Sequence, residues 1–288
     1  MDRIKTSWRK PVTITHDSLF KAPLTPMGAS DRTLELDRGA YARALNKLDG
    51  EDGAAAFHEQ CQATYASDHP IRSSDLGQTF FTTLPLLKPV HAAELRDLMD
   101  RDPAHLRTQD FLADLLTRVF TPALDQALTG WFASYYRPQW YSFQKFHVGD
   151  GRAYSFGWHF DAWSSHCLKL LCYLNGTGDH GGPTMVLDVA QSEAFARAGY
   201  AFPPKQQRLD DLSELASILN LSYHPQTLAM AAGEALLFNP VRLLHRGVVP
   251  TRAERYMLQI CIGPAMRPWQ DECQSGNWPY WDPGSNPV

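Results

Sequence analysis

The feature that most constrains this chain is a change of hydrophobic period near residue 138. Up to about residue 135, apolar residues recur every three or four positions, the spacing of amphipathic helices. Beyond it, the apolar stretches are short, rich in aromatic and branched residues, and bounded by Gly, Asn, Asp or Pro, as strands are. Four helices are expected, at 38–49, 53–66, 92–101 and 108–132. Pro122 should kink or split the longest of them, because proline cannot donate the helical hydrogen bond.

A helical block followed by many short strands predicts a mainly β fold, a sandwich or a barrel, with helices packed on its outside. One helical segment, 209–221, interrupts the strands. No low-complexity linker divides the chain, so we expect one integrated domain with a helical block at 1–135, a β core at 136–265 and a tail at 266–288. The tail contains three tryptophans among prolines and glycines, which favours an ordered lid or wrap over a flexible end.

Charge and cysteine content exclude several classes of function. The net charge is −4 with no basic stripe, so neither nucleic acid nor a membrane surface is an expected partner. The first residues, MDRIKTSWRKPVTITHD, lack the apolar stretch of a signal peptide, and no apolar run is long enough to span a bilayer. The five cysteines form no CxxC pair and are odd in number, which is typical of reduced thiols in a cytoplasmic protein. The sequence does not indicate an oligomeric state.

A candidate metal site begins at His159 and Asp161 in GWHFDA. In an extended strand, side chains two apart lie on the same face, so both can bind one ion. His245, which follows an apolar strand-like run, is the preferred third ligand. Two histidines and one carboxylate on one face of a metal leave three positions open, the facial triad of non-haem Fe(II) oxygenases. Rivals for the third position are His147, whose strand should line the same cavity, His166, and His180. We expect His166 to be exposed or outside the first coordination sphere, and His180 to be solvated in the turn GTGDHGG.

A cationic side chain close to this site could anchor a carboxylate. Arg255 begins the apolar strand RYMLQICIG, on the far side of a turn from His245. A charge near a core needs a partner, and arginine suits bidentate capture of a carboxylate. Arg252 competes for this role, but its place in the turn PTRAE favours an exposed side chain.

Together, His159-x-Asp161, His245 and Arg255 resemble the Fe(II)/2-oxoglutarate-dependent dioxygenase superfamily. The stretch CYLNGTGDHGGPTMVL resembles the YLN…GG-x-T segment of its prolyl-hydroxylase-like branch, and HRGVVPTRAERYMLQI resembles that branch's closing His…Arg hairpin. The resemblance covers roughly residues 140 to 265. It implies a double-stranded β-helix, or jelly-roll, core that binds Fe(II), 2-oxoglutarate and O2. It also implies that Arg255 holds the distal carboxylate of 2-oxoglutarate, with the hydroxyl of Tyr173 reaching the same group.

Further candidates surround these residues. Lys169 lies four residues before Tyr173 on the same strand face and needs an anionic partner, either 2-oxoglutarate or an acidic substrate. Gln259 and Gln144 are candidate donors to the cosubstrate. Trp158, Trp163 and His147 are candidates for contact with the substrate, although packing is the usual role of such aromatic residues.

The expected function is therefore an Fe(II)- and 2-oxoglutarate-dependent hydroxylase of a small molecule, releasing succinate and CO2. Within the family, halogenating members lack the carboxylate ligand, so Asp161 argues against halogenation. Three alternatives stay open: a hydroxylase of a protein or amino-acid side chain, a jelly-roll metalloenzyme that does not use 2-oxoglutarate, and a non-catalytic jelly roll that binds a ligand.

Overall fold

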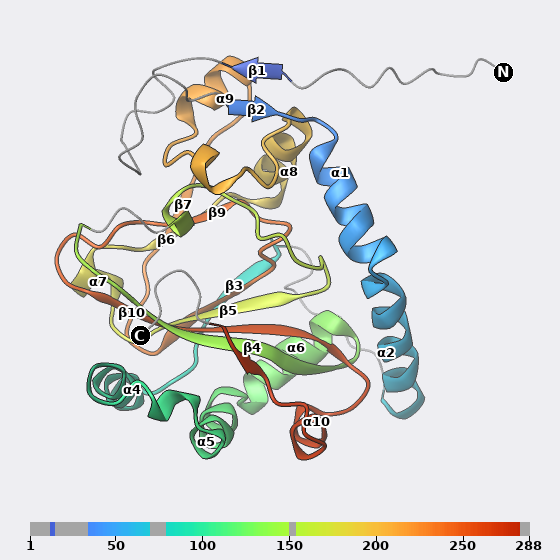
Figure 1. Cartoon of the computed structure of the whole chain (residues 1–288), viewed down its shortest axis with the longest axis vertical. Coiled ribbons are helices and arrows are strands. Elements are labelled where there is room, and N and C mark those ends of the chain that lie inside the picture. The colour runs from blue at the N-terminus through green and yellow to red at the C-terminus, as the bar shows by residue number, and fades with distance from the viewer. Residues whose placement is uncertain (1–11, 15–33, 70–78, 150–153, 283–288) are drawn as a thin grey trace.

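The structure is a computed structural model, and it describes residues 12–14, 34–69, 79–149 and 154–282. The first described elements are two short paired strands and two helices along one side of the molecule (Figure 1). They are β1 (Val12–Ile14), β2 (Leu34–Leu36), α1 (Ala40–Leu45), the π-helical turn η2 (Asn46–Glu51) and α2 (Ala54–Asp68). The helices predicted at 38–49 and 53–66 are therefore present, with their ends shifted by a few residues.

A helical layer follows the edge strand β3 (Phe81–Pro85). It consists of α4 (Pro89–Arg101), the 3-10 turn η3 (His105–Arg107), α5 (Gln109–Val119) and α6 (Pro122–Phe132). The predicted split at Pro122 is confirmed, since Pro122 begins α6. Thr108 and Thr121 cap α5 and α6, because each side-chain hydroxyl accepts a hydrogen bond from the first turn.

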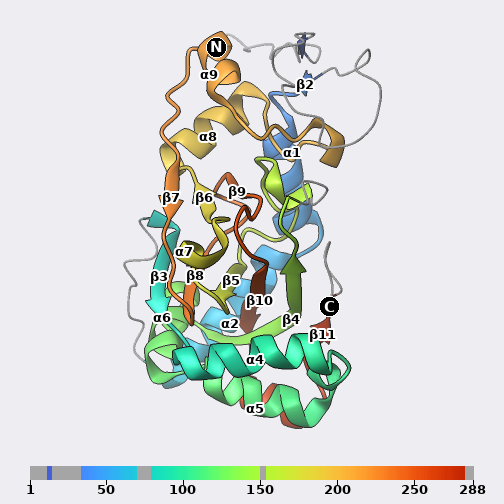
Figure 2. The same ribbon diagram turned by 90° about the vertical axis from the view of Figure 1, so that its left-hand side faces the viewer.

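A six-stranded sheet packs on this helical layer (Figures 1 and 2). Its order is β11-β4-β10-β5-β8-β3, and all neighbours are antiparallel except β11 and β4. The strands not yet located are β4 (Tyr135–Phe146), β5 (Leu168–Tyr173), β8 (Glu234–Phe238), β10 (Arg255–Ala265) and β11 (Tyr280–Trp281). Alternation along β5 sends Leu168, Leu170 and Cys172 into the core shared with the helices. Lys169 and Tyr173 therefore lie on the opposite face.

That opposite face looks toward a smaller antiparallel sheet. Its order is β7-β6-β9, formed by β6 (Thr184–Val186), β7 (Gln226–Leu228) and β9 (His245–Gly247). An isolated bridge between His159 and His245 adds the segment GWHFDA (157–162), here called the metal-motif segment, to this sheet. Two sheets facing each other across an apolar interior agree with the expected jelly-roll arrangement.

Helices contribute more than the prediction of a mainly β fold allowed, and the described chain is mixed α/β. The helix α8 (Val189–Ala198), which was not predicted, lies between β6 and β7 together with α9 (Ser213–Leu219), which is shorter than the expected 209–221. The remaining short helices are η4 (Tyr154–Phe156), α7 (Thr177–His180), η5 (Lys205–Gln207) and α10 (Trp269–Gln274). Among the described residues, no helix is both long and apolar enough to cross a membrane.

Candidate metal centre and cosubstrate pocket

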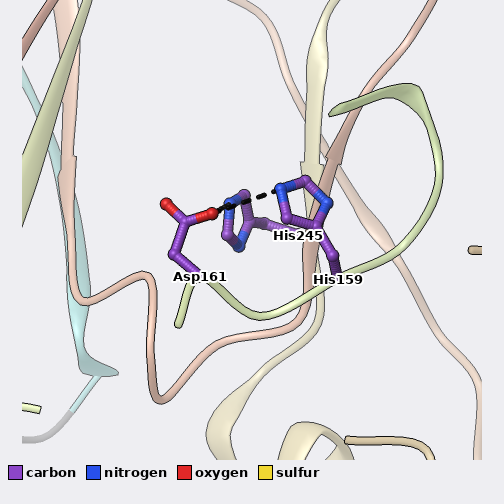
Figure 3. Close-up of side chains that lie close together, drawn as sticks. All are labelled: His159, Asp161 and His245. Atoms are coloured by element: carbon purple, nitrogen blue, oxygen red, sulfur yellow. Dashed lines mark ion pairs between the residues drawn. The ribbon is translucent and has the colours of Figure 1, made fainter. Parts of the chain in front are cut away.

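His159 and His245 are held side by side by the backbone. Each donates its amide N–H to the other's carbonyl oxygen, both at 3.1 Å, and the ring centroids lie 4.3 Å apart. Asp161 is positioned from the same segment, because its amide donates to the carbonyl of Pro240 at 2.9 Å. Figure 3 shows both imidazoles and the carboxylate pointing toward one another. The structure thus brings the three predicted ligands together.

The protonation of both imidazoles follows from their hydrogen bonds. Nδ1 of His159 lies 2.7 Å from the carbonyl oxygen of Gly157, and Nδ1 of His245 lies 3.0 Å from that of Leu243. A carbonyl only accepts, so each Nδ1 carries the proton. Burial lowers the pKa of both groups, that of His245 to about 3. Both rings are therefore neutral at pH 7, and each Nε2 presents a lone pair to the centre.

The two carboxylate oxygens of Asp161 contact different partners. Oδ1 lies 3.4 Å from Nε2 of His159 and 3.8 Å from Nε2 of His245. Oδ2 accepts a hydrogen bond from Nζ of Lys169 at 2.9 Å. Burial opposes the charge of Asp161, but the ammonium of Lys169 outweighs it and holds the pKa of this carboxyl well below its usual range.

These three atoms fit a metal ion. All lie within 4.8 Å of one another. With the protons on Nδ1, neither Nε2 has a hydrogen to share with Oδ1, so two lone pairs and an anionic oxygen converge on one point. A metal cation satisfies such an arrangement. Two imidazole nitrogens and one carboxylate oxygen form the donor set of a non-haem Fe(II) centre.

A cavity of about 510 Å³ opens onto this point from between the sheets. Its volume is that of a small-molecule site. Its lining includes the three ligands and several further predicted residues, namely Gln144, Trp163, Lys169, Arg255 and Gln259.

Arg255 is a buried cation on the cavity wall, only 2% exposed. Its Nη1 donates to the carbonyls of Gly182 at 2.8 Å and Val248 at 3.3 Å, and its guanidinium lies 4.2 Å from the ring centroid of Phe146. Its Nε is buried and has no hydrogen-bond partner. Burial lowers the pKa of Arg255 to about 10, so it stays charged at pH 7. A charged guanidinium whose Nε is left unsatisfied fits an anionic ligand.

Tyr173 lies behind the wall and does not line the cavity. Its hydroxyl is 2.5 Å from Oγ1 of Thr184, and Thr184 does line the cavity. His180 is fully buried and stacks on the Tyr173 ring at 5.9 Å, so the expectation that it is solvated in a turn was wrong. The turn folds inward because Nδ1 of His180 accepts the amide hydrogen of Gly182.

Two predicted substrate contacts lie outside the cavity. His147 follows the end of β4, is 60% exposed, and bonds through Nδ1 to Glu254 at 2.7 Å. Trp158 is fully buried in the apolar cluster beneath α8 and α9. It points away from the cavity because it alternates with His159 along an extended segment. Trp163, the third predicted substrate contact, does line the cavity. Arg252, the rival of Arg255 as the carboxylate anchor, is exposed, and its Nη2 donates to the carbonyl of Thr177.

The sequence did not indicate several residues that line the cavity. Thr184 was within reach, since it ends the GG-x-T segment, but Ser155 and Arg208 carry no motif. Lys205, Arg246 and the tail residues Tyr280 and Asp282 are among the others that were missed. These side chains reach the cavity from segments whose folding onto it has no local sequence signal.

Comparisons with known proteins found matches among solved structures only. No protein-family model matches the chain, and no curated protein sequence does. The non-heme monooxygenase ThoJ in its apo form aligns at 13% identity with a TM-score of 0.47, covering 66% of this chain and 75% of ThoJ.

Two enzymes from nogalamycin biosynthesis also align. The non-heme alpha-ketoglutarate-dependent epimerase SnoN matches at 16% identity with a TM-score of 0.41, covering 73% of this chain and 84% of SnoN. The non-heme alpha-ketoglutarate-dependent carbocyclase SnoK matches at 10% identity with a TM-score of 0.42, covering 74% of this chain and 90% of SnoK. The chain therefore has structural matches among non-heme, alpha-ketoglutarate-dependent enzymes, and it carries an HxD…H triad.

Proposed function

We propose that this protein is an Fe(II)- and 2-oxoglutarate-dependent oxygenase of small molecules. The observation that carries the proposal is the convergence of two Nε2 lone pairs and Asp161 Oδ1 in a cavity that also contains the buried cation Arg255. His159, Asp161 and His245 would hold the iron. Arg255 would hold the distal carboxylate of 2-oxoglutarate, whose keto-acid end binds the metal. When bound, iron and cosubstrate supply the oxidising chemistry, consuming O2 and releasing succinate and CO2.

The chain's own residues fix the geometry. The carbonyls of Gly157 and Leu243 hold both imidazole rings by Nδ1, so that Nε2 keeps its direction. Lys169 occupies Oδ2 of Asp161, so the carboxylate offers the metal Oδ1 alone and leaves the other positions open. This contact gives Lys169 an anionic partner within the protein, whereas the sequence led us to expect 2-oxoglutarate or an acidic substrate as that partner.

Gln144 and Gln259 line the cavity from β4 and β10, on the face that carries Arg255. We assign them to donate amide hydrogens to the cosubstrate. The catalytic core is proposed to span residues 136–265, because the three ligands and Arg255 fall within it. The tail adds Tyr280 and Asp282 to the cavity mouth, in keeping with a wrap over the opening.

The proposed reaction is hydroxylation. Asp161 would occupy the coordination position that, in the family the sequence resembles, a halide takes in halogenating members. A cavity of about 510 Å³ suits a small molecule, whereas a hydroxylase of protein side chains would have to admit a peptide segment.

The proposal is tested by titrating the metal-free protein anaerobically with Fe(II) and then with 2-oxoglutarate, following the visible charge-transfer absorption of the chelate. We expect a band in the wild type and none in Asp161→Ala. Iron binding with no band would indicate a metalloenzyme that does not use 2-oxoglutarate. No iron binding would contradict the metal centre and leave a ligand-binding module.

A further inference from the structure

A second arginine faces the metal centre from the side of the smaller sheet. Arg208 lines the cavity on the segment between α8 and α9, and it is partly buried. His159 and Asp161 line the same cavity as Arg208. Arg255 stands on the larger sheet, at the start of β10. The two arginines therefore line the cavity from different parts of the fold, a helix-connecting segment and a strand of the larger sheet.

The position of Arg208 is fixed by the metal-motif segment itself. The amide of Trp158 donates to the carbonyl of Leu209 at 2.7 Å. The hydroxyl of Tyr200 donates to the carbonyl of Trp158 at 2.9 Å and accepts from the amide of Leu209 at 3.0 Å. Gly157 permits this approach, since a Cβ there would lie 2.5 Å from Cβ of Arg208. The arginine is thus attached to the backbone that carries His159.

An unsatisfied hydroxyl lies in the same cavity wall. Oγ of Ser155 is buried and has no hydrogen-bond partner, although Ser155 lines the cavity. A buried hydroxyl without a partner costs free energy unless a ligand completes it. Ser155 precedes the metal motif in sequence, and Arg208 packs against Gly157 of that segment. Both line the cavity, so they offer it a neutral donor and a cationic donor.

The charges of the loaded centre indicate what these donors bind. The two charges of Fe(II) and the one of Arg255 match those of Asp161 and the 2-oxoglutarate dianion. Among the described residues of the lining, Lys169, Lys205, Arg208 and Arg246 then add four positive charges, against the one negative charge of Asp282. A ligand with a negative group is favoured in such a site.

The rest of the mouth is aromatic. Trp163 and Tyr280 line it while being 39% and 55% exposed, and Trp140 lies deeper in the same wall. Exposed aromatic faces at a cavity mouth suit an apolar, planar ring. Nζ of Lys169 lies 5.7 Å from the ring centroid of Trp140, so the aromatic wall ends beside the metal.

From this geometry we infer that the substrate is a planar, apolar ring compound with an anionic group, and that Arg208, with Ser155, binds that group. That this compound is oxidised rests on the proposed function. The binding of its anionic group does not depend on that function. Arg208 is then a residue that determines specificity, distinct from the cosubstrate anchor Arg255.

The test uses a matched pair of probes, indole-3-acetate and indole-3-acetamide, which share a ring and differ in charge. Binding of each is measured by calorimetry under nitrogen, to the protein loaded with Fe(II) and 2-oxoglutarate and to the metal-free protein. We expect the wild type to bind the carboxylate at least about tenfold more tightly than the amide. Arg208→Gln should abolish this preference, Arg208→Lys should restore part of it, and Arg197→Gln should leave it unchanged, since Arg197 is 78% exposed on α8.

Affinity for 2-oxoglutarate is measured in the same variants. It should stay within about threefold of wild type in Arg208→Gln. A large loss there would overturn the inference by making Arg208 a cosubstrate anchor. Equal affinity for both probes, a preference that survives Arg208→Gln, or no binding of either probe would also overturn it. A preference present in a protein that never forms the iron–2-oxoglutarate chelate would support the anion site while contradicting the proposed function.

Discussion

Replacing Arg255 tests the cosubstrate pocket most directly. Its Nη1 is already occupied by the carbonyls of Gly182 and Val248, so the protein itself holds one corner of the guanidinium. The edge formed by Nε and Nη2 remains, and it is this edge that can pair side-on with a carboxylate through two parallel hydrogen bonds. Arg255→Lys keeps the charge but loses the fork, whereas Arg255→Gln loses both.

The expected losses follow from these contacts. Losing one of two charge-assisted hydrogen bonds in Arg255→Lys should cost about 2–3 kcal/mol, or roughly 30- to 150-fold in the Kd for 2-oxoglutarate. Leaving the distal carboxylate unpaired in a buried site, as in Arg255→Gln, should cost about 3–5 kcal/mol, or more than about 100-fold. Burial enlarges both effects, because Arg255 is only 2% exposed and water cannot replace it.

The assay is anaerobic calorimetry of 2-oxoglutarate binding to the Fe(II)-loaded protein, with Fe(II) affinity measured first. Arg252→Gln is the matched control, since Arg252 is exposed on the same turn and should leave the Kd unchanged. If Arg255→Gln binds iron normally and 2-oxoglutarate within about threefold of wild type, the assignment of the anchor is refuted.

Three further predictions concern the support of the site. Lys169→Met should weaken Fe(II) binding by about 10- to 100-fold, because Oδ2 of Asp161 loses its partner; unchanged affinity in a metal titration would contradict this. Gly157→Ala should cost about 1–3 kcal/mol in urea unfolding through the clash with Arg208, whereas Gly178→Ala, where a Cβ meets nothing within 4 Å, should cost less than about 1 kcal/mol. Burial lowers the pKa of His180 to about 4, below that of the unfolded chain, so the unfolded state takes up the proton first. Stability should therefore fall between about pH 6.5 and pH 4, by at most about 1.4 kcal/mol per pH unit from this group, and a His180→Gln variant that falls equally would refute the assignment.

Local pattern was sufficient for many of the elements, although it missed α8, and for the three proposed metal ligands. Alternation along an extended segment put His159 and Asp161 on one face, and the structure pairs that segment directly with His245. The split at Pro122 followed from the chemistry of proline alone. The same alternation places Trp158 opposite to His159, in the apolar cluster away from the cavity.

Long-range contacts explain what the sequence could not show. Arg208 lines the cavity from a segment that is hydrogen-bonded, through Tyr200 and Leu209, to the backbone of Trp158. No hydrophobic periodicity or sequence motif predicts hydrogen bonds between residues so far apart in the chain. Lys169 forms an ion pair with Asp161 because β5 lies opposite the metal-motif segment. The sequence does not show how these two segments are placed relative to each other. His147 lies just beyond the end of β4 and contacts Glu254 outside the cavity. The sequence pattern does not give the last residue of a strand, so this orientation could not be predicted.

The mutual backbone bonds of His159 and His245 have a consequence for metal exchange. The protein frame, rather than the ion, holds the two imidazoles together, and the carbonyls of Gly157 and Leu243 keep them aimed. A chelator should therefore empty the site without unfolding the chain, and added metal should refill it without a refolding step. A frame of this kind does not by itself reject Mn(II), Co(II) or Ni(II), which accept the same donors. Which ion occupies the centre in a cell is then set largely by the metals that the cell supplies.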